Sequence, residues 1–170
     1  VACHCKGGRL ALNEAISESC NNYFCTVYQR TIDKDGDAHA GMNRWSAHVK
    51  SFGLGTFLGN DLPTGRKGLI PDASYYDRFL GYSTWKGATS VSNGIGQGEL
   101  VATPIQLANM TAAIANRGYY YTPHIIRESD HGPIDSNFTV PNYTTVDSQH
   151  FEVVINGMFD VFERGTAKGA

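Results

Sequence analysis

The 170-residue sequence predicts a mainly α fold with one or two short strands. Apolar residues recur with the period of a helix through most of the chain. A capping signature, Thr103-Pro-Ile-Gln106, comes directly before one of these periodic segments. Only residues 119–127 combine aromatic and β-branched residues as a strand does. We therefore expect four or five helices, one or two short strands and a large loop region.

The first third of the chain predicts three helices. Between Leu10 and Cys20 the periodic face includes Ser19, which would then point toward the core and need a hydrogen-bond partner. The period resumes after Asn21 and Asn22 and is followed by a polar turn at residues 33–37. The third helix ends near Gly53. The apolar positions of the second and third helices are Phe24, Val27, Tyr28, Thr31, Met42, Trp45, Val49 and Phe52.

The remainder alternates between loops and two clear helices. Residues 53–98 carry many glycines and predict a long irregular connection. The helix that begins at Thr103 ends at Gly118 and should bury Leu107, Met110, Thr111 and Ile114. Residues 119–127 predict a strand or ribbon, and residues 128–145 predict a polar loop. A last amphipathic helix begins near Asp147, ends at Gly165 and presents Phe151, Val154, Ile155, Met158, Phe159 and Phe162 on its apolar face.

Composition excludes several classes of protein. The formal net charge is -2, so no basic field is available for nucleic acid or anionic lipid. No apolar run approaches the ~20 residues of a membrane span. The sequence opens on Val1, not on Met, and we expect it to be a piece of a longer protein.

One short motif could carry acyl-transfer chemistry. Ser19 and Asn21 stand two residues apart at a predicted helix–helix junction. A hydroxyl can relay a proton to a leaving nitrogen, while an amide can hold a substrate amide as donor and acceptor. On spacing alone, a structural cap between two helices is the favoured explanation of the pair.

The motif stands in a longer pattern that is similar to a known family. The segment Leu12-Asn-Glu-Ala-Ile-Ser-Glu-Ser-Cys-Asn-Asn-Tyr-Phe24 resembles the second active-site motif of class B penicillin-binding proteins, of the penicillin-binding protein 2 type. The resemblance covers residues 10–127 well. Its further blocks, in order, are Trp45, Phe52-Gly-Leu-Gly55, Gly59-Asn-Asp-Leu-Pro63, Gly68-Leu-Ile-Pro71, Asn93-Gly-Ile-Gly-Gln-Gly-Glu99, Thr103-Pro-Ile-Gln-Leu-Ala-Asn-Met110, Ile114-Ala-Asn-Arg-Gly118 and Pro123-His124.

The resemblance implies the helical subdomain of the α/β penicillin-binding transpeptidase (β-lactamase-like) fold. The parent protein would be a serine D,D-transpeptidase that cross-links peptidoglycan stem peptides and binds β-lactam antibiotics. It would be anchored at the periplasmic face of the inner membrane with the cell-elongation machinery. Ser19 would shuttle a proton to the leaving amine, and Asn21 would hold the substrate amide and orient the base lysine. Gln97 and Gly98 resemble a glycine-rich turn at the rim of the cleft, although a simple backbone turn explains them as well.

Two further motifs of the family are needed, a Ser-x-x-Lys nucleophile and a Lys-Thr-Gly strand. The sequence has no Lys-Thr-Gly, and its one Ser-x-x-Lys, Ser83 to Lys86, follows the Ser-x-Asn motif, whereas the family's nucleophile precedes it. We therefore expect both motifs to lie outside residues 1–170 and this chain alone to be inactive. Two alternatives stay open: a non-catalytic helical binding module, and a self-contained hydrolase that uses Ser83 and Lys86.

The four cysteines lie within the first 25 residues. Cys3-His4-Cys5 is a weak metal signal, because a closed zinc site needs four ligands that usually come as spaced pairs. Some members of the resembled family carry zinc beside the cleft, and Cys3 or Cys5 could match one ligand. Since the other ligands would lie outside the chain, we expect no metal and no other cofactor.

Overall fold

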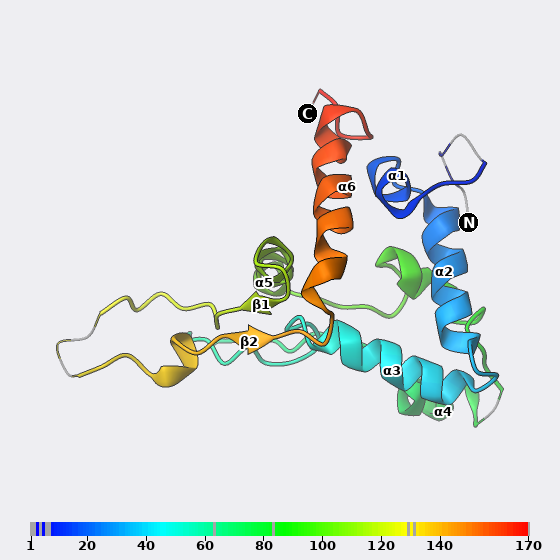
Figure 1. Cartoon of the computed structure of the whole chain (residues 1–170). Coiled ribbons are helices and arrows are strands. Elements are labelled where there is room, and N and C mark those ends of the chain that lie inside the picture. The colour runs from blue at the N-terminus through cyan, green and yellow to red at the C-terminus, as the bar shows by residue number, and fades with distance from the viewer. Residues whose placement is uncertain are drawn as a thin grey trace.

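The computed structural model describes residues 3, 5, 8–62, 64–82, 84–128, 130 and 132–169. It is mainly helical, as predicted, with one small antiparallel ribbon (Figure 1). The helices are α1 (Leu12–Ser17), α2 (Asn21–Asp33), α3 (Ala38–Lys50), α4 (Ala73–Leu80), α5 (Pro104–Ala115) and α6 (Phe151–Glu163). Single 3₁₀ turns are η1 (Val91–Ile95), η2 (Ser136–Phe138) and η3 (Ser148–His150), and the strands are β1 (Tyr119–Tyr120) and β2 (Asn142–Tyr143).

The main core lies where α2, α3 and α4 meet. The helices α2 and α3 follow each other around the predicted turn, and Asp37 starts α3 by accepting hydrogen bonds from the backbone N–H groups of His39 and Ala40. Gly41 allows the two helices to approach closely, because a Cβ there would overlap the carbonyl of Ile32. The buried side chains of this core are Tyr28, Ile32, Met42, Ala73, Tyr76 and Trp85.

The second packing region joins the two ends of the chain. Helix α6 packs along α1, and Gly157 of α6 permits this because a Cβ there would lie 2.9 Å from Ile16 Cδ1. The apolar face of α6 is only partly covered: Phe159 and Phe162 are 64% and 65% exposed. The predicted apolar face is thus present, but among the described residues no element lies over its outer half.

The prediction of an irregular connection over residues 53–98 is correct only in part, since this stretch contains the helix α4 and the 3₁₀ turn η1. Asp72 starts α4 by accepting a hydrogen bond from the backbone N–H of Tyr75 at 3.1 Å. Tyr76 then anchors the helix in the main core. With only eight residues, of which Ala73 and Tyr76 are buried, α4 is too short to give a clear period among the surrounding glycines.

Helix α5 begins with the predicted capping box: Thr103 Oγ1 accepts from the N–H of Gln106, whose Oε1 accepts from the N–H of Thr103 at 2.9 Å. Its buried stripe differs from the prediction. Leu107 is 48% exposed, whereas Gln106 and Asn109 are buried. These two amides hold neighbouring loops, because Gln106 Nε2 donates to the carbonyl of Thr56 at 2.8 Å and Asn109 Nδ2 donates to that of Phe52 at 3.0 Å.

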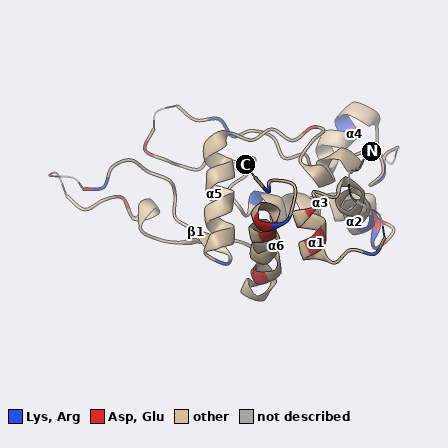
Figure 2. Ribbon diagram, turned by 90° about the horizontal axis from the view of Figure 1, so that it is seen from above, with Lys and Arg blue, Asp and Glu red and all other residues tan. Residues whose placement is uncertain are grey.

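The predicted strand over residues 119–127 is confirmed only at its start. Tyr119 pairs with Tyr143 and Tyr120 with Asn142, so β2 lies inside the stretch predicted as a loop. Beyond these pairs, the segment that follows β1 and the segment that precedes β2 run into the long projection seen in Figure 1. Figure 2 shows charges of both signs scattered over the molecule, and α5 carries none. Among the described residues, no helix is long and apolar enough to cross a membrane.

We predict that Gly41→Ala lowers the free energy of unfolding by about 1–3 kcal/mol, because the added methyl group forces α2 and α3 apart. Urea unfolding measures this change. The control is Gly65→Ala, where the nearest atom to a new Cβ, Phe57 Cδ1, lies 3.6 Å away. A Gly41→Ala chain as stable as the original would contradict the close helix crossing.

The candidate active-site corner

The predicted helix over residues 10–20 ends early, at Ser17, and the chain turns sharply before α2. Two backbone hydrogen bonds close this end: Ser19 N–H donates to the Ile16 carbonyl at 3.0 Å, and Cys20 N–H donates to the Ala15 carbonyl at 2.9 Å. This is a Schellman motif, whose left-handed position is usually glycine. Here Ser19 occupies it, with φ 49°.

The turn places the Ser19 hydroxyl on the surface. Ser19 is exposed, and its Oγ lies 2.9 Å from Thr166 Oγ1, in the segment that follows α6. The N–H of Thr166 donates to the carbonyl of Ser17 at 3.1 Å, which holds that segment against the corner. The prediction that Ser19 faces the core is therefore wrong, because the helical period on which it rested stops two residues earlier.

Asn21 is the first residue of α2, and Cys20 is the N-cap residue. Asn21 is half-buried, and Cys20 is buried. The first N–H groups of a helix have no partners within the helix and provide a positive electrostatic potential at this end. We call residues 18–21 the α1–α2 corner: it brings a surface hydroxyl, an amide side chain and a helix N-terminus together within four residues.

Gln97 and Gly98 lie in the turn after η1, and both are exposed. The N–H of Gln97 donates to the carbonyl of Ser92 at 3.1 Å, and Gly98 has φ 76°, so this position favours glycine. The turn belongs to the same unit as the corner, because η1 packs on α2 (Figure 1). A Cβ on Gly94 of η1 would lie 2.6 Å from Tyr28 Cβ, which shows how close the two elements are.

A buried polar network beneath this turn was not predicted from the sequence. The Tyr76 hydroxyl donates to Glu99 Oε2 at 2.8 Å and lies 2.7 Å from the side-chain amide of Asn93. The Tyr28 hydroxyl lies 2.9 Å from Ser90 Oγ. Burial raises the pKa of both Tyr28 and Tyr76, so both hydroxyls remain protonated hydrogen-bonding groups. The network joins α2, α4 and η1 and thereby fixes the turn relative to α2.

We predict that Tyr76→Phe lowers the free energy of unfolding by about 1–3 kcal/mol, because Glu99 and Asn93 lose a buried partner. Urea unfolding tests this, with Tyr82→Phe on the exposed face as the matched control. Equal stability of the two variants would contradict a structural role for the network.

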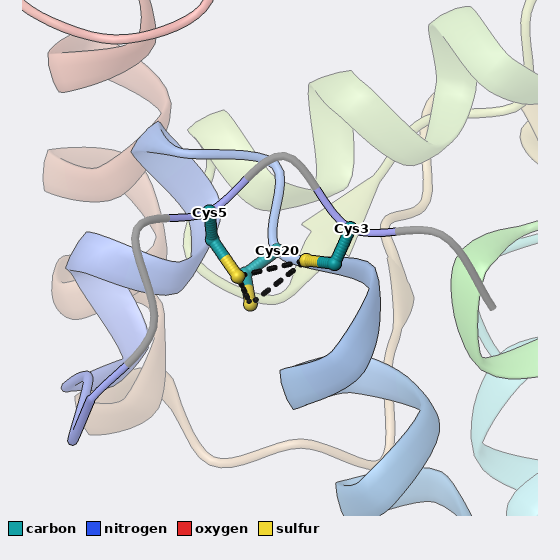
Figure 3. A group of neighbouring side chains, drawn as sticks. All are labelled: Cys3, Cys5 and Cys20. Carbon is teal, nitrogen blue, oxygen red and sulfur yellow. Dashed lines mark hydrogen bonds between the residues drawn. The ribbon is translucent and has the colours of Figure 1, made fainter.

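Three cysteine sulfurs gather at the corner (Figure 3). The Sγ atoms of Cys3 and Cys5 lie 2.7 Å apart, those of Cys5 and Cys20 2.6 Å, and those of Cys3 and Cys20 3.5 Å. The weak Cys3-His4-Cys5 signal thus gains a third sulfur that sequence analysis missed. A group of three thiols suits soft metal ions, which prefer thiolate ligands. It would still need one more ligand to make a closed tetrahedral zinc site.

The surroundings also change the acidity of Cys3. Hydrogen bonds, first from the backbone N–H of Asn22 and then from the Cys5 thiol, lower the pKa of Cys3 from 9.0 to about 6. Cys3 is therefore largely a thiolate at neutral pH, and thiolates are the reactive form of cysteine.

We predict that the rate of Cys3 alkylation by iodoacetamide follows a titration with its midpoint near pH 6. In urea the midpoint should return toward 9.0, because the hydrogen bond from Asn22 is lost. Mass spectrometry of the peptide that contains Cys3 measures the rate. The same midpoint in the folded and unfolded chain would show that the fold does not stabilise the thiolate.

The alternative nucleophile receives no support from the described residues. Ser83 lies outside the residues that the structure describes, and Lys86 is exposed. Among the described residues, the candidate active site is therefore the α1–α2 corner with its neighbouring turn.

Comparison with known proteins shows the family of the chain. The family model of the penicillin binding protein transpeptidase domain matches residues 3–170, so the chain belongs to this family. Among curated relatives, it is 34% identical over 170 residues to the peptidoglycan D,D-transpeptidase MrdA of Acinetobacter baumannii, covering 95% of this chain and 23% of that protein. The resemblance to the penicillin-binding protein 2 type is thereby confirmed.

Solved structures show the same fold. The structure of Pseudomonas aeruginosa PBP2 in complex with WCK 5153 is similar with a TM-score of 0.78 and 31% identity, over 95% of this chain and 35% of that one. The structure of PBP2 from Helicobacter pylori is similar with a TM-score of 0.74, and the complex between PBP2 and MreC from the same organism with a TM-score of 0.70. In the complex the identity is 25%, over 95% of this chain and 28% of that one. The chain thus spans about a quarter to a third of the proteins that it matches.

Proposed function

We propose that this chain is the helical part of a serine D,D-transpeptidase that cross-links peptidoglycan stem peptides and binds β-lactam antibiotics. The observation that carries the proposal is the α1–α2 corner: in a member of the transpeptidase family, the sequence's one Ser-x-Asn motif lies at the surface. A purely structural cap would more simply point its side chain at the first N–H groups of α2. The Ser19 hydroxyl instead contacts Thr166, across the chain.

Two residues of the corner and two of the neighbouring turn have a role in this proposal. Ser19 passes a proton to the leaving amine when the acyl-enzyme forms, because its exposed hydroxyl both donates and accepts. Asn21 holds the substrate amide with its carboxamide and orients the base lysine. Gln97 and Gly98 form the rim, where the exposed turn that packs beside α2 limits how the stem peptide lies.

The nucleophile and the carboxylate-binding strand belong, in this proposal, to other parts of a longer protein. Within the 170 residues there is no Lys-Thr-Gly, and the one Ser-x-x-Lys follows Ser19. The exposed Phe159 and Phe162 of α6 agree with a chain whose remaining partner elements lie elsewhere. Residues 1–170 would therefore be one portion of the transpeptidase domain and inactive alone.

The partners follow from the same proposal. The Pseudomonas relative was solved with WCK 5153 and the Helicobacter relative with MreC. By analogy, we expect the longer protein to take stem peptides and β-lactams in the cleft, to join the cell-elongation machinery, and to work at the periplasmic face of the inner membrane.

Labelling with fluorescent penicillin tests the proposal. The longer protein that contains this sequence should be acylated, whereas the 170-residue chain should show no band. In the longer protein, Ser19→Ala or Asn21→Ala should lower the acylation rate by roughly 10²–10⁴-fold, the range expected for loss of proton transfer. The matched control is Ser148→Ala, at an exposed serine of η3.

Three results would contradict the proposal. A labelled band on the 170-residue chain would show that it contains its own nucleophile, and a label on Ser83 would identify it. Full acylation of the Ser19→Ala and Asn21→Ala proteins would show that the corner is only a helix junction.

A further inference from the structure

The hydroxyl of Thr166 contacts the Ser19 hydroxyl at the α1–α2 corner, from a position 147 residues further along the chain. The two oxygen atoms are 2.9 Å apart, and either can be the donor. Both residues are exposed, so the pair lies at the surface. Figure 1 shows the segment after α6, in red, turning beside α1. The proposed function gives Thr166 no role.

The backbone around Thr166 is fixed against the end of α1. Its N–H donates to the carbonyl of Ser17 at 3.1 Å. The preceding residue, Gly165, approaches the same carbonyl so closely that a Cβ would lie 2.2 Å from the oxygen, and only glycine fits there. About two turns earlier on α6, Gly157 makes a similar close approach to Ile16. Helix α6 and the turn after it thus present Thr166 to the corner.

The side chain of Ser19 needs a partner to keep one orientation. Its backbone is fixed by the hydrogen bonds that close α1 and by its left-handed conformation. The side chain still has three staggered χ1 positions, and its hydroxyl hydrogen rotates as well. The contact with Thr166 Oγ1 selects one of these positions, because only that one brings the two oxygen atoms within hydrogen-bond distance.

We propose that Thr166 is a positioning residue for the acylation step: its hydroxyl holds the Ser19 hydroxyl in the orientation that passes a proton to the leaving amine. This inference rests on the proposed function, because the orientation of Ser19 affects the rate only if Ser19 transfers that proton. Thr166 itself touches neither the substrate nor the reacting atoms.

The proton balance of the step defines what Thr166 supplies. The nucleophilic oxygen bonds to the substrate carbonyl carbon, the C–N bond of the substrate breaks, and the proton of the nucleophile passes to the base lysine. Ser19 gives its hydrogen to the leaving nitrogen and receives the proton from the lysine, so it ends unchanged. Its second lone pair meanwhile accepts a hydrogen bond from the Thr166 hydroxyl. Thr166 therefore fixes the Ser19 oxygen without competing for the transferred proton.

The test measures acylation of the longer protein by fluorescent penicillin, as a rate constant at saturating penicillin and an apparent dissociation constant. Thr166→Val keeps the shape of the side chain and removes the hydroxyl. We expect its saturating rate constant to fall roughly 2–10-fold, the factor that corresponds to one neutral hydrogen bond, with an unchanged dissociation constant. Thr166→Ser keeps the hydroxyl and should restore the original rate.

The matched control is Thr111→Val, at an exposed threonine whose hydroxyl donates to the Leu107 carbonyl within α5 at 3.0 Å. This variant should be acylated at the original rate. Thr166→Ala provides a second chain without the hydroxyl, and circular dichroism establishes that the compared variants are folded. In the Ser19→Ala background, Thr166→Val should cause no further loss of rate, since the hydroxyl that it positions is absent.

Four results would overturn the inference and leave the proposed function intact. They are an unchanged rate in the folded hydroxyl-free variants, a Thr166→Ser protein as slow as Thr166→Val, an equal loss with and without the Ser19 hydroxyl, and an effect confined to the dissociation constant. Full acylation of Ser19→Ala would instead contradict the proposed function, and this inference with it.

Discussion

The left-handed backbone of Ser19 is the constraint on which the rest of this corner depends. With φ 49° it ends α1 in a position where a residue with a Cβ costs free energy. This conformation turns the chain sharply between α1 and α2, which begins at Asn21. As a result, Ser19 is exposed to solvent and Cys20 is buried. Strained positions of this kind often mark functional sites, because the surrounding structure must hold them.

What holds the corner is contact with distant parts of the chain. Thr166 meets Ser19 from beyond α6, and α6 itself lies against α1 through Gly157. On the other side, α2 enters the main core with Tyr28 and Ile32, and η1 with its exposed turn is packed against it. The polar network around Tyr76 connects the same turn to α4. The site is thus built from one local turn and from packing that spans nearly the whole sequence.

Local signals in the sequence predicted local structure well. The capping box at Thr103, the turn before α3 and the amphipathic α6 depend on residues within one or two helical turns, and all three are present. The orientation of Ser19 toward the core was predicted wrongly, because a periodic pattern does not reveal that a serine will end a helix in the left-handed conformation.

Features that depend on distant contacts were not predictable in this way. The buried side of α5 is polar because Gln106 and Asn109 bind loop carbonyls some 40 to 60 residues away in sequence, which hydrophobic periodicity cannot reveal. Cys20 meets Cys5 across 15 residues for the same reason. The pairing of β1 with β2 spans a loop that carried no strand signal.

The most direct test of the central claim compares the free energies of unfolding of Ser19→Gly and Ser19→Ala. Both variants lose the hydroxyl that contacts Thr166, so their difference reports the backbone conformation. If residue 19 is left-handed, the glycine variant should be more stable than the alanine variant by about 1–2 kcal/mol. If residue 19 instead continues an ordinary helix, alanine should be more stable by roughly 0.5–1 kcal/mol, and that result would contradict the account.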